Sequence, residues 1–368
     1  MATSSEARKP HDIVIDPEGD ISIHLIKEET AKHPVTGEKS TIETTIACYK
    51  VSRKILSESS PVWDASLRGH FRESRSSTVP VYFGTLKSLE LWFRIVHDVM
   101  VDEMYDIKVV DVYEAIEVCG NREWDIFKLS KSTWAREWMN RQKHRELDLD
   151  GMCRLIYLAK ELDFPREFMY MTRKLVYGTA EHIKDRNPTN HQHLHLDHTV
   201  INALNGAKGN LRCKILKGLF TPVGAFLGQR CECKKDSLYE YCTGLSLTGI
   251  WPLETHMKKS AQEILDTFDD FQCDIPENAC NACRIRLSDS SIERTGEQIQ
   301  EHFDGLCLDC MSISKPKDGK NVDAAYWQHD TLRQYSMGCR VQHGQPTWYW
   351  SFMGRRTQMQ AHQAARQR

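Results

Sequence analysis

Two closely spaced cysteine pairs near the end of the chain constrain its folding more than any other feature. Cys280 and Cys283 form one CxxC pair, and Cys307 and Cys310 form a second after residues 284–306. A CxxC turn presents two thiolates from one tight loop, so two such turns supply the four soft ligands of a tetrahedral zinc site. The sequence therefore predicts that these four cysteines bind zinc. Four buried, reduced cysteines without metal are the alternative interpretation.

The segment between the two pairs has room for a short helix. Ser290 and Glu293 have the spacing of a capping box, in which a helix begins just after the serine. Ile292, Ile299 and Phe303 then recur at helical spacing. We therefore expect a small zinc module that contains a helix.

Other cysteines predict a second metal site. The chain has 13 cysteines, and many of them lie between residues 231 and 339. Cys231 and Cys233 form a CxC turn, while Cys339 and His343 form a Cys-x3-His pair. Together they predict a second zinc site with three thiolates and one imidazole, the alternative being core cysteines and an interface histidine. Further candidate ligands are Cys242, Cys273 and His329.

The cysteine content also indicates a compartment. An odd number of cysteines, a polar start from Met1 to His11 and many charged residues argue against a secreted disulfide framework. No stretch approaches the roughly 20 apolar residues of a membrane helix. We expect a reducing compartment, either cytoplasmic or nuclear. Clustered cysteines bind metal there more often than they form disulfides.

The N-terminal third alternates between strand and helix patterns. Residues 20–26 and 41–51 predict two strands joined by a turn at residues 33–39. The apolar period then becomes helical over residues 52–67 and returns to that of a strand at residues 78–82. Further helices are predicted at residues 86–96 and 109–119.

This order of elements resembles the BTB/POZ domain. The resemblance is carried by Val51 to Trp63, Phe71 to Ser74 and Leu86 to Val96, where a serine ends one helix before an aromatic residue opens the next. The family usually has a histidine just before the first helix, and Val51 and Ser52 stand there instead. The chain is thus similar to a divergent member over about residues 11–125. The resemblance implies a domain that forms dimers or binds a cullin-type ubiquitin-ligase scaffold.

The rest of the chain is similar to a branch of that family in filamentous fungi, which joins a BTB domain to a cysteine-rich tail. The matching stretches are Leu204 to Arg212, Phe303 to Met311 and Gly338 to Arg356. This resemblance implies an architecture and adds no mechanism.

These patterns predict three parts and two tails. We expect an α+β BTB/POZ-like domain at residues 11–125, a helical linker region at 126–210 and a small zinc-stabilised cysteine-rich domain at 211–354. Zinc would supply folding free energy that the core of so small a domain cannot. Residues 1–10 are expected to be a disordered tail, and residues 355–368 a basic flexible one.

The helical linker region contains two patterns that we interpret as structural. An apolar stripe from Val200 to Leu219 is typical of a helix packed in a core. Before it, residues 187–198 contain four closely spaced histidines. Because this segment begins at a helix-breaking Asn-Pro and ends beside Asp197, a predicted N-cap, we interpret it as a connection with Leu194 and Leu196 packed.

Catalytic motifs are absent from the sequence. It contains no GxxxxGK phosphate loop, no GxGxxG after a strand, no GxSxG elbow and no HExxH pair. A catalytic zinc needs an open coordination position, whereas CxxC pairs normally close the site. The sequence thus predicts a protein that is not an enzyme.

Nucleic-acid binding is the alternative function. A formal net charge of −2 gives no general attraction to nucleic acid or anionic membranes, and residues 288–304 between the cysteine pairs are acidic. The aromatic residues near Arg355 and Arg356 would suit stacking on single strands, and they suit a core equally well. We therefore predict a protein–protein interaction protein with a structural zinc module. A zinc-dependent nucleic-acid-binding or transcription-associated regulator is the alternative.

Overall fold

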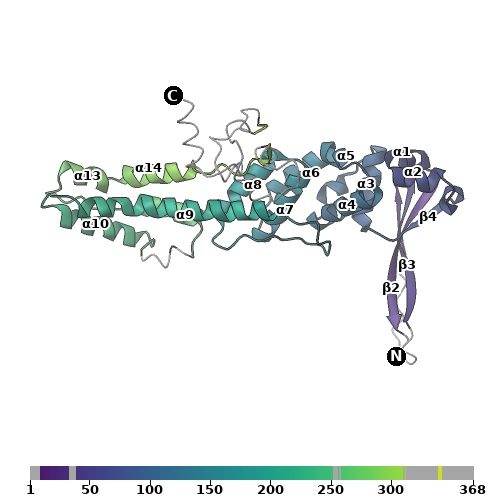
Figure 1. The fold of residues 1–368 in the computed structure, drawn as a ribbon, viewed down its shortest axis with the longest axis horizontal. Helices are drawn as coiled ribbons and strands as arrows, with labels where there is room; N and C mark the ends of the chain where they lie inside the picture. Colours follow the sequence, from purple (N-terminus) through teal and green to yellow (C-terminus); the bar gives the residue numbers. More distant parts are fainter. Residues whose placement is uncertain are drawn as a thin grey trace, which may run out of the picture. The chain divides into compact units, whose positions relative to one another are not determined.

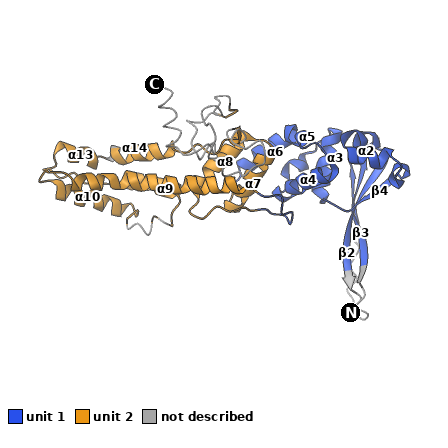
Figure 2. Ribbon diagram, in the orientation of Figure 1, with its two compact units in different colours: residues 1–145, 187–195 blue, residues 146–186, 196–368 orange. Residues whose placement is uncertain are grey.

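The chain divides into two compact units in the computed structural model. Figure 1 shows the helices and strands, and Figure 2 colours the units. Unit 1 comprises residues 1–145 and 187–195, and unit 2 comprises residues 146–186 and 196–368. The structure describes residues 9–32, 39–251, 256, 258–309, 311 and 339–341.

The division differs from the predicted boundaries at residues 125 and 210. Unit 1 extends to Arg145 because two tryptophans of helix α6 (Thr133–Lys143) are tied to the 3-10 helix η2 (Asp102–Asp106) and to the residue that follows it. The Trp134 indole donates to the carbonyl of Met104 over 2.7 Å, and the Trp138 indole donates to that of Ile107 over 3.0 Å. Residue 210 lies inside one continuous helix, α9 (His198–Leu227), so no boundary falls there.

Unit 1 is built on a four-stranded mixed sheet in the order β1-β3-β2-β4. Strands β2 and β3 are antiparallel, while β1 is parallel to β3 and β4 is parallel to β2. Ile21, Ile23 and Leu25 alternate into the core, as the strand period predicts. The four strands are β1 (His11–Val14), β2 (Ile21–Lys32), β3 (Lys39–Val51) and β4 (Thr78–Val81).

These strands confirm the predicted ones and add β1, while residues 33–38 of the predicted turn lie outside the described residues.

The helical pattern at residues 52–67 forms two helices, because Ser60 ends α1 and caps α2 with Pro61 as its first residue. Besides α6, the helices of unit 1 are α1 (Arg53–Ser59), α2 (Pro61–Arg68), α3 (Leu86–His97), α4 (Val109–Arg122), α5 (Ile126–Lys131) and the short 3-10 helices η1 (Arg72–Arg75) and η2 (Asp102–Asp106).

The core of unit 1 centres on three tryptophans. Trp92 and Trp124 stack with ring centroids 5.0 Å apart, and Trp63 lies 6.4 Å from Trp124. The Trp124 indole donates to the Ser59 hydroxyl, so the ring closes the core over the end of α1. Arg122 covers the Trp63 ring, and burial lowers the pKa of its guanidinium to about 10.

Unit 2 is helical and is organised along α9. The predicted apolar stripe is confirmed as core, with Val200, Leu204, Leu211 and Ile215 fully buried. The Asp197 carboxylate accepts from the Thr199 amide and caps α9, as predicted. The other helices are α7 (Leu149–Glu161), α8 (Pro165–Gly178), α10 (Lys234–Leu247), α12 (Ala261–Leu265), η3 (Phe268–Asp270), α13 (Asn281–Leu287) and α14 (Asp289–Gln300).

The segment between the cysteine pairs forms two helices, α13 and α14, rather than one. Ile292, Ile299 and Phe303 are buried as predicted. The predicted capping box at Ser290 is wrong, because α14 already begins at Asp289 with Ser288 in the N-cap position. Ser288 is extended and directly follows α13, so the chain enters α14 without a longer turn.

Across the part of the chain that the structure describes, every helix is too short or too polar to cross a bilayer.

The tryptophan core makes a testable prediction about unit 1. Replacing Trp124 by alanine removes a stacked ring and its hydrogen bond, and we expect a loss of about 3–5 kcal/mol in the free energy of unfolding. Hydrogen exchange of the α3 and α4 amides measures this loss in unit 1 alone. The control is Phe127→Ala, whose ring is 60% exposed and whose effect should stay within about 0.5 kcal/mol. Equal effects of the two substitutions would contradict the described core.

Candidate metal centre

Four cysteines from two places in the sequence meet in unit 2. Cys231, Cys233, Cys280 and Cys283 bring their sulfur atoms within 4.8 Å of one another. All four are free thiols rather than disulfides. Cys233 and Cys283 are buried, and the other two are partly exposed. The arrangement therefore has the composition and proximity of a four-thiolate metal site.

Two helix starts create this meeting point. Cys233 occupies the N-cap position of α10, directly after the turn that carries Cys231. Cys280 occupies the N-cap position of α13, and Cys283 lies in the first turn of that helix. Because α10 and α13 contact one another, the two cysteine turns face each other (Figure 1).

The sulfur distances fit a tetrahedral ion. Cys283 Sγ lies 3.7 Å from Cys231 Sγ and 3.8 Å from Cys233 Sγ. Four thiolates at a Zn–S bond length of about 2.3 Å are separated from one another by about 3.8 Å. The Cys280 amide also donates to Cys233 Sγ over 3.3 Å, an outer contact that supports a negatively charged sulfur. The donor set therefore fits zinc without rearrangement.

The four thiols of the cluster do not lose their protons equally readily. Hydrogen bonding from the backbone amide of Cys283 lowers the pKa of Cys280 to about 7. Hydrogen bonding with Cys233, together with burial, raises the pKa of Cys231 to about 12. Crowded thiols cannot all ionise without a cation, and a metal ion removes this conflict as it displaces the protons.

The grouping of cysteines differs from the predicted one. Cys280 and Cys283 join Cys231 and Cys233, not Cys307. The reason is the length of the intervening helices, since α14 alone has 12 residues and extends about 18 Å. Sequence spacing shows which cysteines share a turn, but not which turns meet.

Cys307 and Cys339 lie in a second group, in which Asp309 supplies the third donor atom within 4.8 Å. Cys339 was predicted to join Cys231 and Cys233, and Asp309 was not predicted as a ligand. A carboxylate inside a cysteine-rich stretch can be recognised only from the fold. Cys310, His343 and the spare candidate His329 lie outside the described residues.

The other candidates play no part in either group. Cys242 is exposed on α10, and Cys273 is partly exposed before α13. In the histidine-rich segment, His191 and His193 pair with Glu114 and Glu117 of α4. Leu194 and Leu196 are 4% and 2% exposed, which confirms their predicted packing.

Comparison with known proteins gives no match to a family model, to a curated protein or to a solved structure.

The four-cysteine centre makes a prediction about metal and folding. Because Cys283 is fully buried among the other three sulfurs, Cys283→Ser should remove bound zinc and unfold unit 2. The matched control is Cys213→Ser, an exposed cysteine of α9 that lies in neither group. Elemental analysis and circular dichroism measure the two effects. Zinc content unchanged by Cys283→Ser would refute the assignment.

Proposed function

We propose that this chain is a non-enzymatic protein–protein interaction protein whose unit 2 is stabilised by zinc. The observation that carries this proposal is the four-cysteine centre. Its four sulfurs fill every position of a tetrahedral ion, so no position is left for a substrate or an activated water. Such a centre holds helices together and does not perform chemistry.

The organisation of unit 1 supports a BTB/POZ-like role in dimerisation or adaptor binding. Strands β2 and β3, the pair α1 and α2, strand β4 and helices α3 and α4 follow one another in the order that suggested this family. The Ser60 hydroxyl accepts from the Trp63 amide, so a serine separates the two helices before an aromatic residue. On this proposal the partner is a second copy of the chain or a cullin-type ubiquitin-ligase scaffold.

A partly open strand edge in unit 1 also supports an interaction role. Strand β4 pairs with β2 over Ser22 to Leu25 only, whereas β2 continues beside β3 to Lys32. In the described part of the chain, the outer edge of β2 beyond Leu25 therefore has no neighbouring strand. Lys27, Glu28 and Glu29 stand on this open edge, and such charges discourage indiscriminate strand addition and favour a partner of complementary charge.

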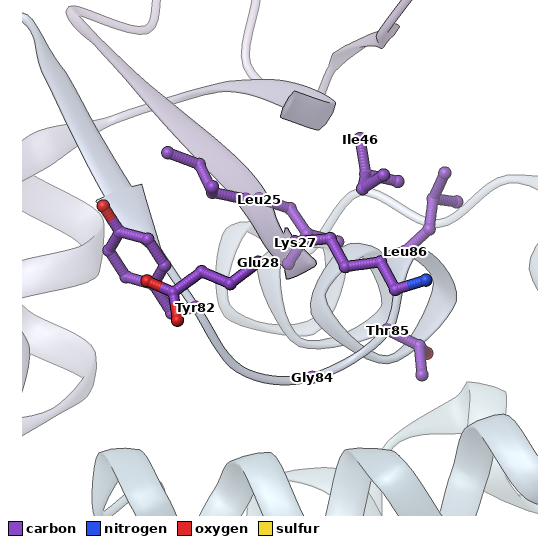
Figure 3. A pocket seen from close by; sticks show the side chains of 9 residues that line it. Leu25, Lys27, Glu28, Ile46, Tyr82, Gly84, Thr85 and Leu86 are labelled. Carbon is purple, nitrogen blue, oxygen red and sulfur yellow. The ribbon is translucent and has the colours of Figure 1, made fainter. Parts of the chain in front are cut away.

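A hollow of about 540 Å³ opens beside this edge (Figure 3). Leu25 and Ile46 form apolar parts of its lining, and Tyr82 lies at one side with its hydroxyl near Glu43, 3.5 Å away. Glu28 stands opposite Glu43 across the two strands, an unfavourable like-charge pair that a basic partner residue would relieve. The surface combines an apolar base with a charged rim that includes both Lys27 and Glu28, which suits a protein partner.

The interaction role predicts self-association or cullin binding by the full chain. Light scattering over a range of concentrations tests the first, and a pull-down with a cullin N-terminal domain tests the second. Trp124→Ala should abolish either activity by loosening unit 1, whereas Cys283→Ser should preserve it because the centre lies in unit 2. A strict monomer that also fails to retain the cullin domain would argue against the proposal.

Nucleic-acid binding is disfavoured by the surface of α14. Its exposed residues Glu293 and Glu297 and the exposed C-cap residue Glu301 follow one another at four-residue spacing and form an acidic stripe. Phosphates are repelled by such a stripe, and non-specific affinity depends on neutralising phosphates with cations. The aromatic residues near Arg355 and Arg356 lie outside the described residues.

This surface predicts weak binding to random DNA. At physiological salt, labelled duplex and single-stranded DNA should bind the full chain with dissociation constants above about 1 μM. Changing Glu293 and Glu297 together to lysine should tighten binding, since it reverses the stripe. Tight wild-type binding with a steep salt dependence would favour the nucleic-acid alternative.

A further inference from the structure

The second group of metal-binding side chains in unit 2 brings residues 307–309 and 339–341 together. Cys307 and Cys339 are far apart in sequence, yet their sulfurs and an Asp309 oxygen lie within 4.8 Å of one another. Cys307 is fully buried, and Val341 is 7% exposed beside it. Met169 of α8 packs against the same small cluster. The site therefore joins residues 339–341 to the body of unit 2.

The backbone before Cys307 is held against α8. Gly305 has φ +110°, and a Cβ atom there would lie 2.0 Å from the carbonyl oxygen of Met169. The next amide, that of Leu306, donates to the Thr172 hydroxyl over 2.9 Å. Only glycine permits this close approach, so the backbone that leads to Cys307 is held against α8.

Arg340 holds the other side of the group. Its guanidinium donates to both oxygens of Asp163, over 2.8 and 2.6 Å, and to Asp309 Oδ1 over 2.7 and 2.9 Å. Its own amide donates to Asp309 Oδ2 over 2.7 Å. These bonds set the position of the neighbouring Cys339 and orient the Asp309 carboxylate, as outer-shell partners do in metal sites.

The charges of the group call for a cation. Asp163 and Asp309 together contribute two negative charges, and Arg340 contributes one positive charge. The net charge of these three side chains is negative before either cysteine thiol ionises, and each thiolate adds a further negative charge. A divalent ion beside two sulfurs and a carboxylate offsets this charge.

We propose that Cys307, Cys339 and Asp309 bind a second zinc-like ion, which fastens residues 339–341 onto α8. Binding forms two metal–sulfur bonds and releases two thiol protons to solvent, with no change of oxidation state. This site goes beyond the proposed function, which requires only the four-cysteine centre.

Metal content per full-length chain tests the proposal directly. Protein purified under reducing conditions should carry two zinc ions by elemental analysis and native mass spectrometry. Cys339→Ser should carry one, and the exposed-cysteine control Cys213→Ser should carry two. One ion in the wild type, or two in Cys339→Ser, overturns the second site while leaving the four-cysteine centre intact. No zinc in the wild type would remove both centres.

Two further measurements keep the test decisive if Cys339→Ser loses both ions. Arg340→Gln leaves every ligand in place, and it should weaken retention of the second ion against a chelator by about tenfold or more. Cobalt substitution of the wild type should give two spectral components, because four-thiolate and mixed thiolate–oxygen sites absorb differently. A single four-thiolate spectrum, or a Cys307–Cys339 disulfide found by mass spectrometry, contradicts the proposal.

Discussion

Unit 2 depends on one contact, in which the N-terminal ends of helices α10 and α13 bring four cysteine sulfurs together. Helix α13 has seven residues and α12 has five, and isolated helices shorter than about 12 residues are marginal in water. Ordering each residue costs about 1–2 kcal/mol of conformational entropy. A structural zinc ion contributes on the order of 10 kcal/mol, which offsets the ordering of several residues. A metal ion bound at this centre would thus compensate for helices too short to sustain themselves.

Unit 1 achieves its stability by a different route. Trp63 of α2, Trp92 of α3 and Trp124, which follows α4, fill its core with large rings. Each of these aromatic side chains buries more apolar surface than an aliphatic one. The metal groups found among the described residues all lie in unit 2. The contrast explains why we expect loss of zinc to affect one unit and to spare the other.

Features set by neighbouring residues were predictable from the sequence. The alternation of Ile21, Ile23 and Leu25 identified a strand, and Asp197 identified the start of α9. Both the strand and the helix start depend only on residues that are close together in the sequence. The error at Ser290 has the same local origin. Two serines within one turn can each precede a helix, and α14 begins after Ser288, the residue at which α13 ends.

The partners of the cysteine pairs were not predictable, because they depend on contacts between distant helices. Every cysteine turn supplies two similar sulfurs, so any two turns satisfy the same chemistry. The choice is made by packing: α10 meets α13, while α14 carries the chain away from Cys283 before Cys307. The two metal groups then have different tasks. The cysteines of the first come from two helix starts, and in the second Arg340 ties residues 339–341 to Asp163, which lies just before α8, and to Asp309.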